Sequence, residues 1–376
     1  MSNIIGSRFK ALRERSSIKT SEVAQALGLE DDDSISAIEN GDRQPSADNI
    51  VQAMRLFKVS LEMLTDPFLL VNEGQFSWRQ SGVSGADLAE YERDAGRFIA
   101  AYRALSPTLG HTSPINSSLA KSAADRASRL VERSSFENAV SAAENLAETL
   151  RLGAIPAEGL PNAIERELGI LVLMVDPTDG ISGAACKLSD ADVILINRRD
   201  VPGRRNFDLG HELFHILTWR AMPPAHIEDI NELQRSRVEQ LADNFASALL
   251  MPSSVIARYG DWNALGTQDL IAKLNSVADE LRVTSSALRW RLVGLEKLSR
   301  ASAKAVPDER LRHNGKDKPD SGDIPRLYAQ SFVELFGKAI AEGKISIRRA
   351  AALLQLTIDD LSQLFISYNI DPPFEI

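Results

Sequence analysis

The chain has 376 residues and a formal net charge of −9, with 44% hydrophobic and 25% charged residues. This length predicts roughly two or three globular domains, and the acidic balance argues against non-specific nucleic-acid binding by the whole chain. The single cysteine, Cys186, excludes an internal disulfide and therefore a secreted disulfide scaffold. The first ten residues lack a signal-peptide pattern, and no apolar run approaches the ~20 residues that span a bilayer. We therefore expect a cytoplasmic protein with no membrane partner.

Residues 1–68 carry the pattern of a compact helical domain. Apolar side chains recur at helical spacing throughout, and turn residues separate the runs. The third expected helix begins near Asp32, buries Ile35 and Ile38, and ends at Asn40-Gly41.

The rest of the chain changes character along its length. Short β-branched runs in the middle predict a small sheet, whereas helical periodicity dominates elsewhere, so we expect an α+β protein that is mainly α. The expected strands are 170–175, 181–186 and 193–196. The expected segments are an all-α domain over 1–68, a helical connector over 69–139, a mixed domain over 140–300, a flexible linker over 301–323 and a helical C-terminal tail over 324–376.

The strongest chemical signal is the sequence His211-Glu212-Leu213-Phe214-His215. The two histidines are four residues apart, so a helix places both on one face, where they can ligate one metal ion. Glu212 is then within reach of a water on that ion. Zinc lowers the pKa of such a water to about 7, and a carboxylate can accept its proton during attack on a carbonyl. The pattern predicts a zinc-dependent hydrolase; two structural histidines on a packed or solvated helix face are the common alternative.

A second expected helix supplies a third ligand. Glu239 and Asp243 are also four residues apart and lie beside an apolar stripe. Glu239 would complete three protein ligands, which leaves the fourth position of a catalytic zinc for water. Asp243 would hydrogen-bond the outer nitrogen of a ligand histidine and orient it. The alternatives are a solvated helix charge for Glu239 and ligation by His226 instead, from a loop that contains prolines.

Four segments, 204–215, 239–246, 249–252 and 281–292, resemble the ImmA/IrrE family of metallopeptidases, and the resemblance extends over roughly residues 140–300. It implies a gluzincin-like site in which His211, His215 and Glu239 hold zinc. Glu212 would then be the general base. The resemblance also implies a substrate class, because family members cleave a helix-turn-helix repressor and thereby derepress stress, phage or mobile-element genes.

Residues 8–66 resemble the XRE (Cro/repressor-like) helix-turn-helix family. The matching positions include Leu12-Arg13, Thr20, Val23-Ala24, Leu27-Gly28, Ile35-Ser36, Ile38-Glu39, Gly41, Arg43 and Pro45. Such modules place their second motif helix in the major groove of double-stranded DNA. The residues expected to recognise DNA or protein there are Ser34, Ser36, Asn40 and Arg43.

The charge of this module leaves its partner open. Residues 1–68 hold eight basic and eleven acidic side chains, and acids at the groove-facing end of a helix oppose phosphate contacts. The same acids would stabilise the N-terminus of the helix. Double-stranded DNA, a homodimer partner and the helix-turn-helix of a repressor all remain open as partners.

Two further residues carry a chemical and a structural interpretation. Tyr259 could stabilise the oxyanion of a tetrahedral intermediate, or it could be a packing or surface residue. Cys186 could be a core thiol or a redox-sensitive inhibitory zinc ligand.

The sequence therefore predicts a transcription-linked zinc endopeptidase that cleaves a helix-turn-helix repressor. The alternative is a sequence-specific DNA-binding regulator, or an antitoxin-like protein, in which the metallopeptidase-like domain is a sensor or scaffold.

Overall fold

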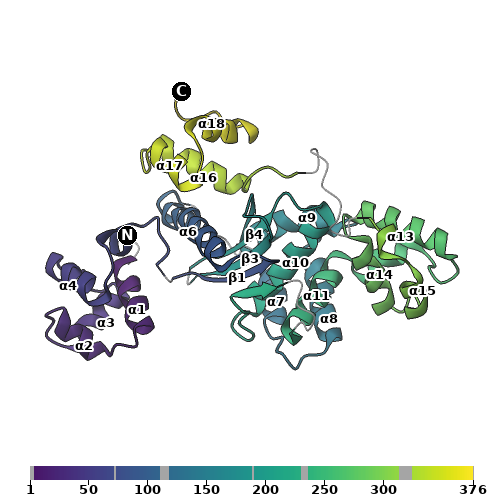
Figure 1. Ribbon diagram of the computed structural model, residues 1–376, viewed down its shortest axis with the longest axis horizontal. Helices are drawn as coiled ribbons and strands as arrows, with labels where there is room; N and C mark the ends of the chain where they lie inside the picture. Colours follow the sequence, from purple (N-terminus) through teal and green to yellow (C-terminus); the bar gives the residue numbers. More distant parts are fainter. Residues whose placement is uncertain are drawn as a thin grey trace.

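The computed structural model describes residues 4–71, 73–110, 118–188, 190–229, 236–312 and 324–375. They form an all-helical N-terminal domain, one mixed sheet, and helices that cover both faces of the sheet (Figure 1). The expected α+β class, mainly helical with a small sheet, is confirmed. Within the described ranges, every helix is too short or too polar to cross a bilayer.

The N-terminal domain buries one apolar cluster, which includes Ile35 and Ile38. Asp31 caps its third helix, because its carboxylate accepts hydrogen bonds from the amide and the hydroxyl of Ser34. Gly41 ends that helix in the left-handed region at φ 88°. The helices are α1 (Ile4–Arg15), α2 (Thr20–Ala26), α3 (Asp32–Asn40), α4 (Ala47–Phe57) and α5 (Leu61–Thr65).

The sheet has the strand order β2-β4-β3-β1-β5. The β2–β4 and β1–β5 pairs are parallel, whereas β3 runs antiparallel to both β4 and β1. Strands β2, β3 and β4 are the three predicted from sequence. The strands are β1 (Gln75–Gln80), β2 (Leu171–Val175), β3 (Ile181–Lys187), β4 (Asp192–Asn197) and β5 (Ile227–Asp229).

Strand β1 lies within residues 69–139, which the sequence predicts to be a helical connector, and so corrects that expectation. Polar and apolar residues alternate from Gln75 to Arg79, the pattern of a half-exposed strand, but the residues from Phe76 to Gln80 are all buried. Ser77 and Arg79 also interrupt the apolar run that marks a buried strand. The segment that follows the N-terminal domain therefore supplies an inner strand of the sheet.

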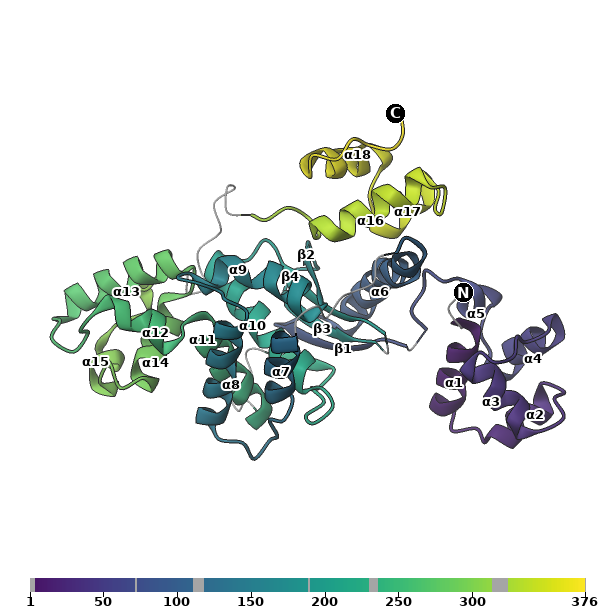
Figure 2. The same cartoon turned by 180° about the vertical axis from the view of Figure 1, so that it is seen from behind.

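Each face of the sheet packs against its own group of helices (Figure 2). On one face, Trp78, Cys186 and Leu195 pack in a core with α6 (Gly85–Thr108), α16 (Gln330–Ala341), α17 (Ile347–Leu354) and α18 (Ile358–Ser367). On the other face, Ala185 and Ile194 share a core with α7 (Ser118–Ala127), α8 (Phe136–Thr149), α10 (Pro202–Thr218) and α11 (Arg237–Leu250). The metal motif lies on this second face.

A further group of helices continues the second core. Residues 301–312, part of the expected flexible linker, belong to it: Ala303, Val306 and Leu311 are buried, and Arg289 pairs with Asp308. The linker expectation is wrong for these residues, and 313–323 lie outside the described ranges. The elements are α9 (Pro156–Ala163), the π-helix Ile164–Leu168, α12 (Ser253–Ile256), the 3-10 turns Ala257–Tyr259 and Asp308–Arg310, α13 (Thr267–Leu281), α14 (Ser285–Gly294) and α15 (Arg300–Ala305).

Ion pairs join the N-terminal domain to the rest of the chain. Arg8 of α1 is fully buried and pairs with Glu73 at 3.1 Å, and Arg103 of α6 pairs with the other oxygen of Glu73 at 3.0 Å. Arg349 of α17 pairs with Asp66. These pairs hold the N-terminal domain against the C-terminal part of α6, through Arg103, and against α17, through Arg349.

Candidate metal centre

Helix α10 carries the two histidines and the glutamate between them. Pro202 opens the helix, and one face packs into the core beneath the sheet. His211 and His215 project from the same face because they are one turn apart. His211 is 0% exposed, and Glu212 and His215 are each 1% exposed.

Helix α11 lies against α10 and carries Glu239 and Asp243 on successive turns. Ser236 caps the helix by accepting a hydrogen bond from the amide of Glu239. The two helices approach closely at Gly210, where an added Cβ would lie 3.2 Å from the Cα and the Cβ of Ala246. This contact brings the α11 carboxylates up to His211.

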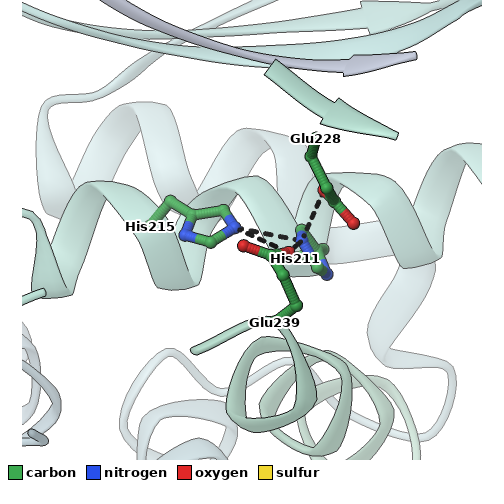
Figure 3. Close-up of side chains that lie close together, drawn as sticks. All are labelled: His211, His215, Glu228 and Glu239. Carbon is green, nitrogen blue, oxygen red and sulfur yellow. Dashed lines mark hydrogen bonds and ion pairs between the residues drawn. The ribbon is translucent and has the colours of Figure 1, made fainter. Parts of the chain in front are cut away.

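Four side chains bring one ligand atom each to a common point, all within 4.8 Å of one another (Figure 3). His211 Nε2 lies 3.0 Å from His215 Nε2, 3.0 Å from Glu239 Oε2 and 3.2 Å from Glu228 Oε2. His215 Nε2 lies 3.5 Å from Glu239 Oε2. In a tetrahedral zinc site, neighbouring ligand atoms are about 3.3 Å apart, given metal–ligand distances of roughly 2.0–2.1 Å. The donor set fits zinc in both chemistry and spacing.

Charge at the site also favours a cation. Burial and Arg79 oppose a proton on His211, but Glu228 and Asp243 outweigh them and hold the pKa of His211 well above 6.5. Burial likewise opposes the ionised form of Glu239, but the two histidines hold its pKa far below the usual range. Burial lowers the pKa of His215 and so favours the neutral imidazole that binds metal. The carboxylates therefore stabilise positive charge at this point.

Glu212 has the surroundings expected of a group that acts on a substrate or water. Both carboxylate oxygens are buried, and neither has a hydrogen-bond partner among the described residues. Burial raises the pKa of Glu212 to about 8. An unpartnered buried carboxylate is costly, so it is unusual unless another group satisfies it.

The predicted outer partner of a histidine is in place. Asp243 Oδ1 lies 3.0 Å from His211 Nδ1, the ring nitrogen that points away from the four-atom cluster. This hydrogen bond orients the ring and turns Nε2 toward the other three ligand atoms, where Arg79 Nη1 also lies 3.2 Å from it.

The sequence reasoning missed two residues of the site, Glu228 and Arg79. Glu228 lies on the edge strand β5, and Arg79 lies beside it on β1. Arg79 donates to Glu228 Oε1 at 2.5 Å and to Asp208 of α10 at 2.9 Å. Burial alone would lower the pKa of Arg79, but Asp208 and Glu228 outweigh it and raise that pKa. No local pattern marks either residue, because their proximity depends on the β1–β5 pairing.

The other residues weighed from sequence lie apart from the four-atom cluster. His226 is exposed, and its Nε2 lies 2.7 Å from Glu92 Oε2 of α6. Tyr259 donates its hydroxyl to Glu280 at 2.8 Å. Cys186 packs in the core on the opposite face of the sheet from α10, where burial raises the pKa of its thiol. The structure brings none of these three side chains to the histidines.

The four recognition residues expected in the N-terminal domain lie on α3 and just beyond it. Ser36 and Asn40 are on α3, and both are exposed. Arg43 follows the helix and donates to the hydroxyl of Ser34 at 3.2 Å. Ser34 also contacts Asp31, so acidic residues form the entry of the helix.

A cavity of about 970 Å³ adjoins the metal centre between α8, α10, α11 and α14. Asp208, Asp243 and Arg79 line its inner end, and exposed Trp290 is also part of its wall. The cavity therefore reaches the groups that surround His211.

Comparison with protein-family models gives two matches. Residues 165–292 match the IrrE N-terminal-like domain of a peptidase family, and residues 4–66 match a helix-turn-helix domain. Comparison with curated proteins and with solved structures gives no match. The first range contains α10 and α11 with the metal-centre residues, and the second contains α1 to α5. The chain thus joins an XRE-like helix-turn-helix domain to an IrrE N-terminal-like metallopeptidase domain, the combination found in ImmA/IrrE proteins with a helix-turn-helix.

Proposed function

We propose that this protein is a zinc-dependent endopeptidase whose substrate is a helix-turn-helix transcriptional repressor. The observation that carries the proposal is the convergence of His211, His215 and Glu239 beside Glu212, whose carboxylate has no hydrogen-bond partner within the part of the chain that the structure describes. Two histidines and a glutamate are a known ligand set of catalytic zinc in peptidases.

Each residue has a distinct role in this reaction. His211, His215 and Glu239 would hold the metal, and Asp243 would orient His211 through its Nδ1. Zinc bound there would supply Lewis-acid polarisation of the scissile carbonyl and of the attacking water. Glu212 would accept the proton of that water on a carboxylate oxygen and then pass it to the leaving amine.

The substrate class rests on the resemblance and on the domain combination. An XRE-like domain in the same chain offers a surface that can pair with the related domain of a repressor. The acidic entry of α3, with Asp31 as its cap, suits a protein partner better than phosphate groups. DNA binding through residues 1–68 is the competing use of this domain.

Metal content tests the site directly. We expect about one zinc per wild-type chain by mass spectrometry, and a sharp loss in His211→Ala and Glu239→Ala. His226→Ala is the matched control, because this histidine is exposed and bonded to Glu92. Absence of zinc from the wild type after reconstitution would reject the proposal.

Cleavage requires a second comparison. New protein N-termini in host cells that express the wild type should be absent from cells that express Glu212→Gln, whereas both proteins should retain zinc. Helix-turn-helix proteins should be among the cleaved species. Equal cleavage by the two proteins would show that Glu212 is not the general base.

A further inference from the structure

The two histidines and the general base of the metal centre are shielded from solvent in this structure, whereas Glu228 and Glu239 are each 9% exposed. His211, Glu212 and His215 are at most 1% exposed, and none of the three lines the neighbouring cavity. An endopeptidase must place a length of extended polypeptide against its general base and metal. In this conformation, a protein substrate cannot reach them.

Strand β5 is the element that covers the site. It lies at the edge of the sheet, pairs with β1 over only three residues, and points Glu228 inward while its neighbours Ile227 and Asp229 remain exposed. Figure 3 shows Glu228 reaching His211 from this strand, on the side opposite Glu239. The Glu228 carboxylate thus takes the side of the cluster that α10 and α11 leave open.

The two oxygens of Glu228 have separate partners. Oε1 accepts from Arg79, and Oε2 lies 3.2 Å from His211 Nε2, at the edge length of a tetrahedral zinc site. Arg79 is held in turn by Asp208, which lies one turn before His211 on α10. Arg79, whose Nη1 also lies 3.2 Å from His211 Nε2, therefore fixes the position of Glu228 and turns Oε2 toward the other ligand atoms.

From this geometry we infer that Glu228 is a fourth protein ligand, and that it closes the metal site in a resting state which excludes both water and substrate. Four protein ligands are typical of structural zinc, whereas catalytic zinc keeps one open position. Activation then requires β5 to leave the edge of β1 and carry Glu228 away from the metal. The inference rests on the proposed zinc site and adds its regulation.

The test uses full-length protein loaded with Co²⁺, whose visible spectrum reports its ligands, and azide as a small ligand for an open position. We expect no azide-dependent change in the wild-type spectrum. Glu228→Gln should give an azide-dependent shift. Its metal affinity should fall roughly 10-fold or more, since loss of an outer partner alone costs that much. Asp229→Asn is the matched control, because this side chain is exposed on the same strand, and it should behave as the wild type.

The possible results separate this inference from the proposed function. If wild type and Glu228→Gln bind Co²⁺ equally well and respond equally to azide, Glu228 is not a ligand, although the zinc site stands. If the wild type binds neither Co²⁺ nor Zn²⁺, both proposals fail. If circular dichroism shows that Glu228→Gln is misfolded, Glu228→Asp provides the same comparison. Aspartate retains the negative charge, but its side chain is one methylene too short to bring a carboxylate oxygen to the metal site.

Discussion

Gly210 of α10 lies directly against Ala246 of α11, where even a Cβ would make a tight contact of 3.2 Å. The contact is one residue before His211 and, along α11, one turn beyond Asp243. Both helices bring their ligating side chains to the same point only because the backbones approach this closely. The geometry of the metal centre therefore depends on a residue that cannot itself bind metal.

Replacing Gly210 should weaken metal binding without altering any ligand. Gly210→Val places atoms within 3.2 Å of Ala246 and forces the helices apart, which moves Glu239 away from His211. We expect a loss of zinc affinity of about 10-fold or more, measured by competition with a chelator. Gly294→Ala is the control, because that helical glycine faces open space and its replacement should leave zinc affinity unchanged. Unchanged affinity in Gly210→Val would show that the helices can separate without moving the ligands.

Asp243 should affect the metal through its hydrogen bond to His211. Asp243→Ala removes the hydrogen bond to His211 Nδ1 and leaves the ring free to rotate, so zinc affinity should fall about 10- to 100-fold. The exposed neighbour Gln240 on the same helix provides a control substitution, Gln240→Ala. The zinc dissociation constant of each variant is the measurement. A loss of the same size in both variants would point to general damage to α11.

The buried pair at the domain junction should contribute more to stability than its partly exposed neighbour. Glu73→Gln leaves the guanidinium of Arg8 buried without its counter-charge, so it should destabilise the junction by about 3 kcal/mol. Arg103→Gln leaves the Arg8–Glu73 pair intact and should cost less, because the guanidinium of Arg8 keeps its counter-charge. Hydrogen exchange of α1 and α5 measures both effects. Equal protection in the two variants would mean that the pair does not hold the domain.

Asp200 should make stability depend on pH. Burial raises the pKa of this carboxyl to about 6 from 3.8, despite the attraction of Arg204. The folded state therefore favours the protonated form of Asp200 more than the unfolded state does. As the pH rises from about 4 to 6, the carboxyl ionises and the folded protein loses stability relative to the unfolded chain. Asp200→Asn does not titrate, so we expect it to match the wild type at pH 4 and to exceed it by about 1–3 kcal/mol at pH 7. Urea unfolding at both pH values provides the measurement, and an unchanged difference between them would contradict the prediction.

The sequence predicted the features that depend on local spacing. The i and i+4 pairs on two helices identified the residues of α10 and α11 that converge, and the β-branched runs identified β2 to β4. Glu228 and Arg79 could not be found in this way. They meet because a three-residue edge strand pairs with a strand more than a hundred positions earlier in the chain.

The segment 301–312 illustrates a second limit. Its sequence mixes alanines with charged residues, and of its apolar side chains only Ala303, Val306 and Leu311 are buried. Arg289 of the preceding helix, α14, secures it by donating to the Val306 carbonyl and the Asp308 carboxylate, and composition alone cannot reveal these contacts.

The place of β1 between β3 and β5 has a practical consequence for work on fragments of this protein. A fragment that begins at residue 140, or spans only the family match from 165 to 292, lacks β1 and exposes the backbone donors and acceptors of β3. Unpaired inner strands of this kind tend to associate with other chains. A soluble fragment that contains the metal centre should therefore begin before Gln75. To separate the helix-turn-helix domain from it, the chain must be cut between that domain and the start of β1.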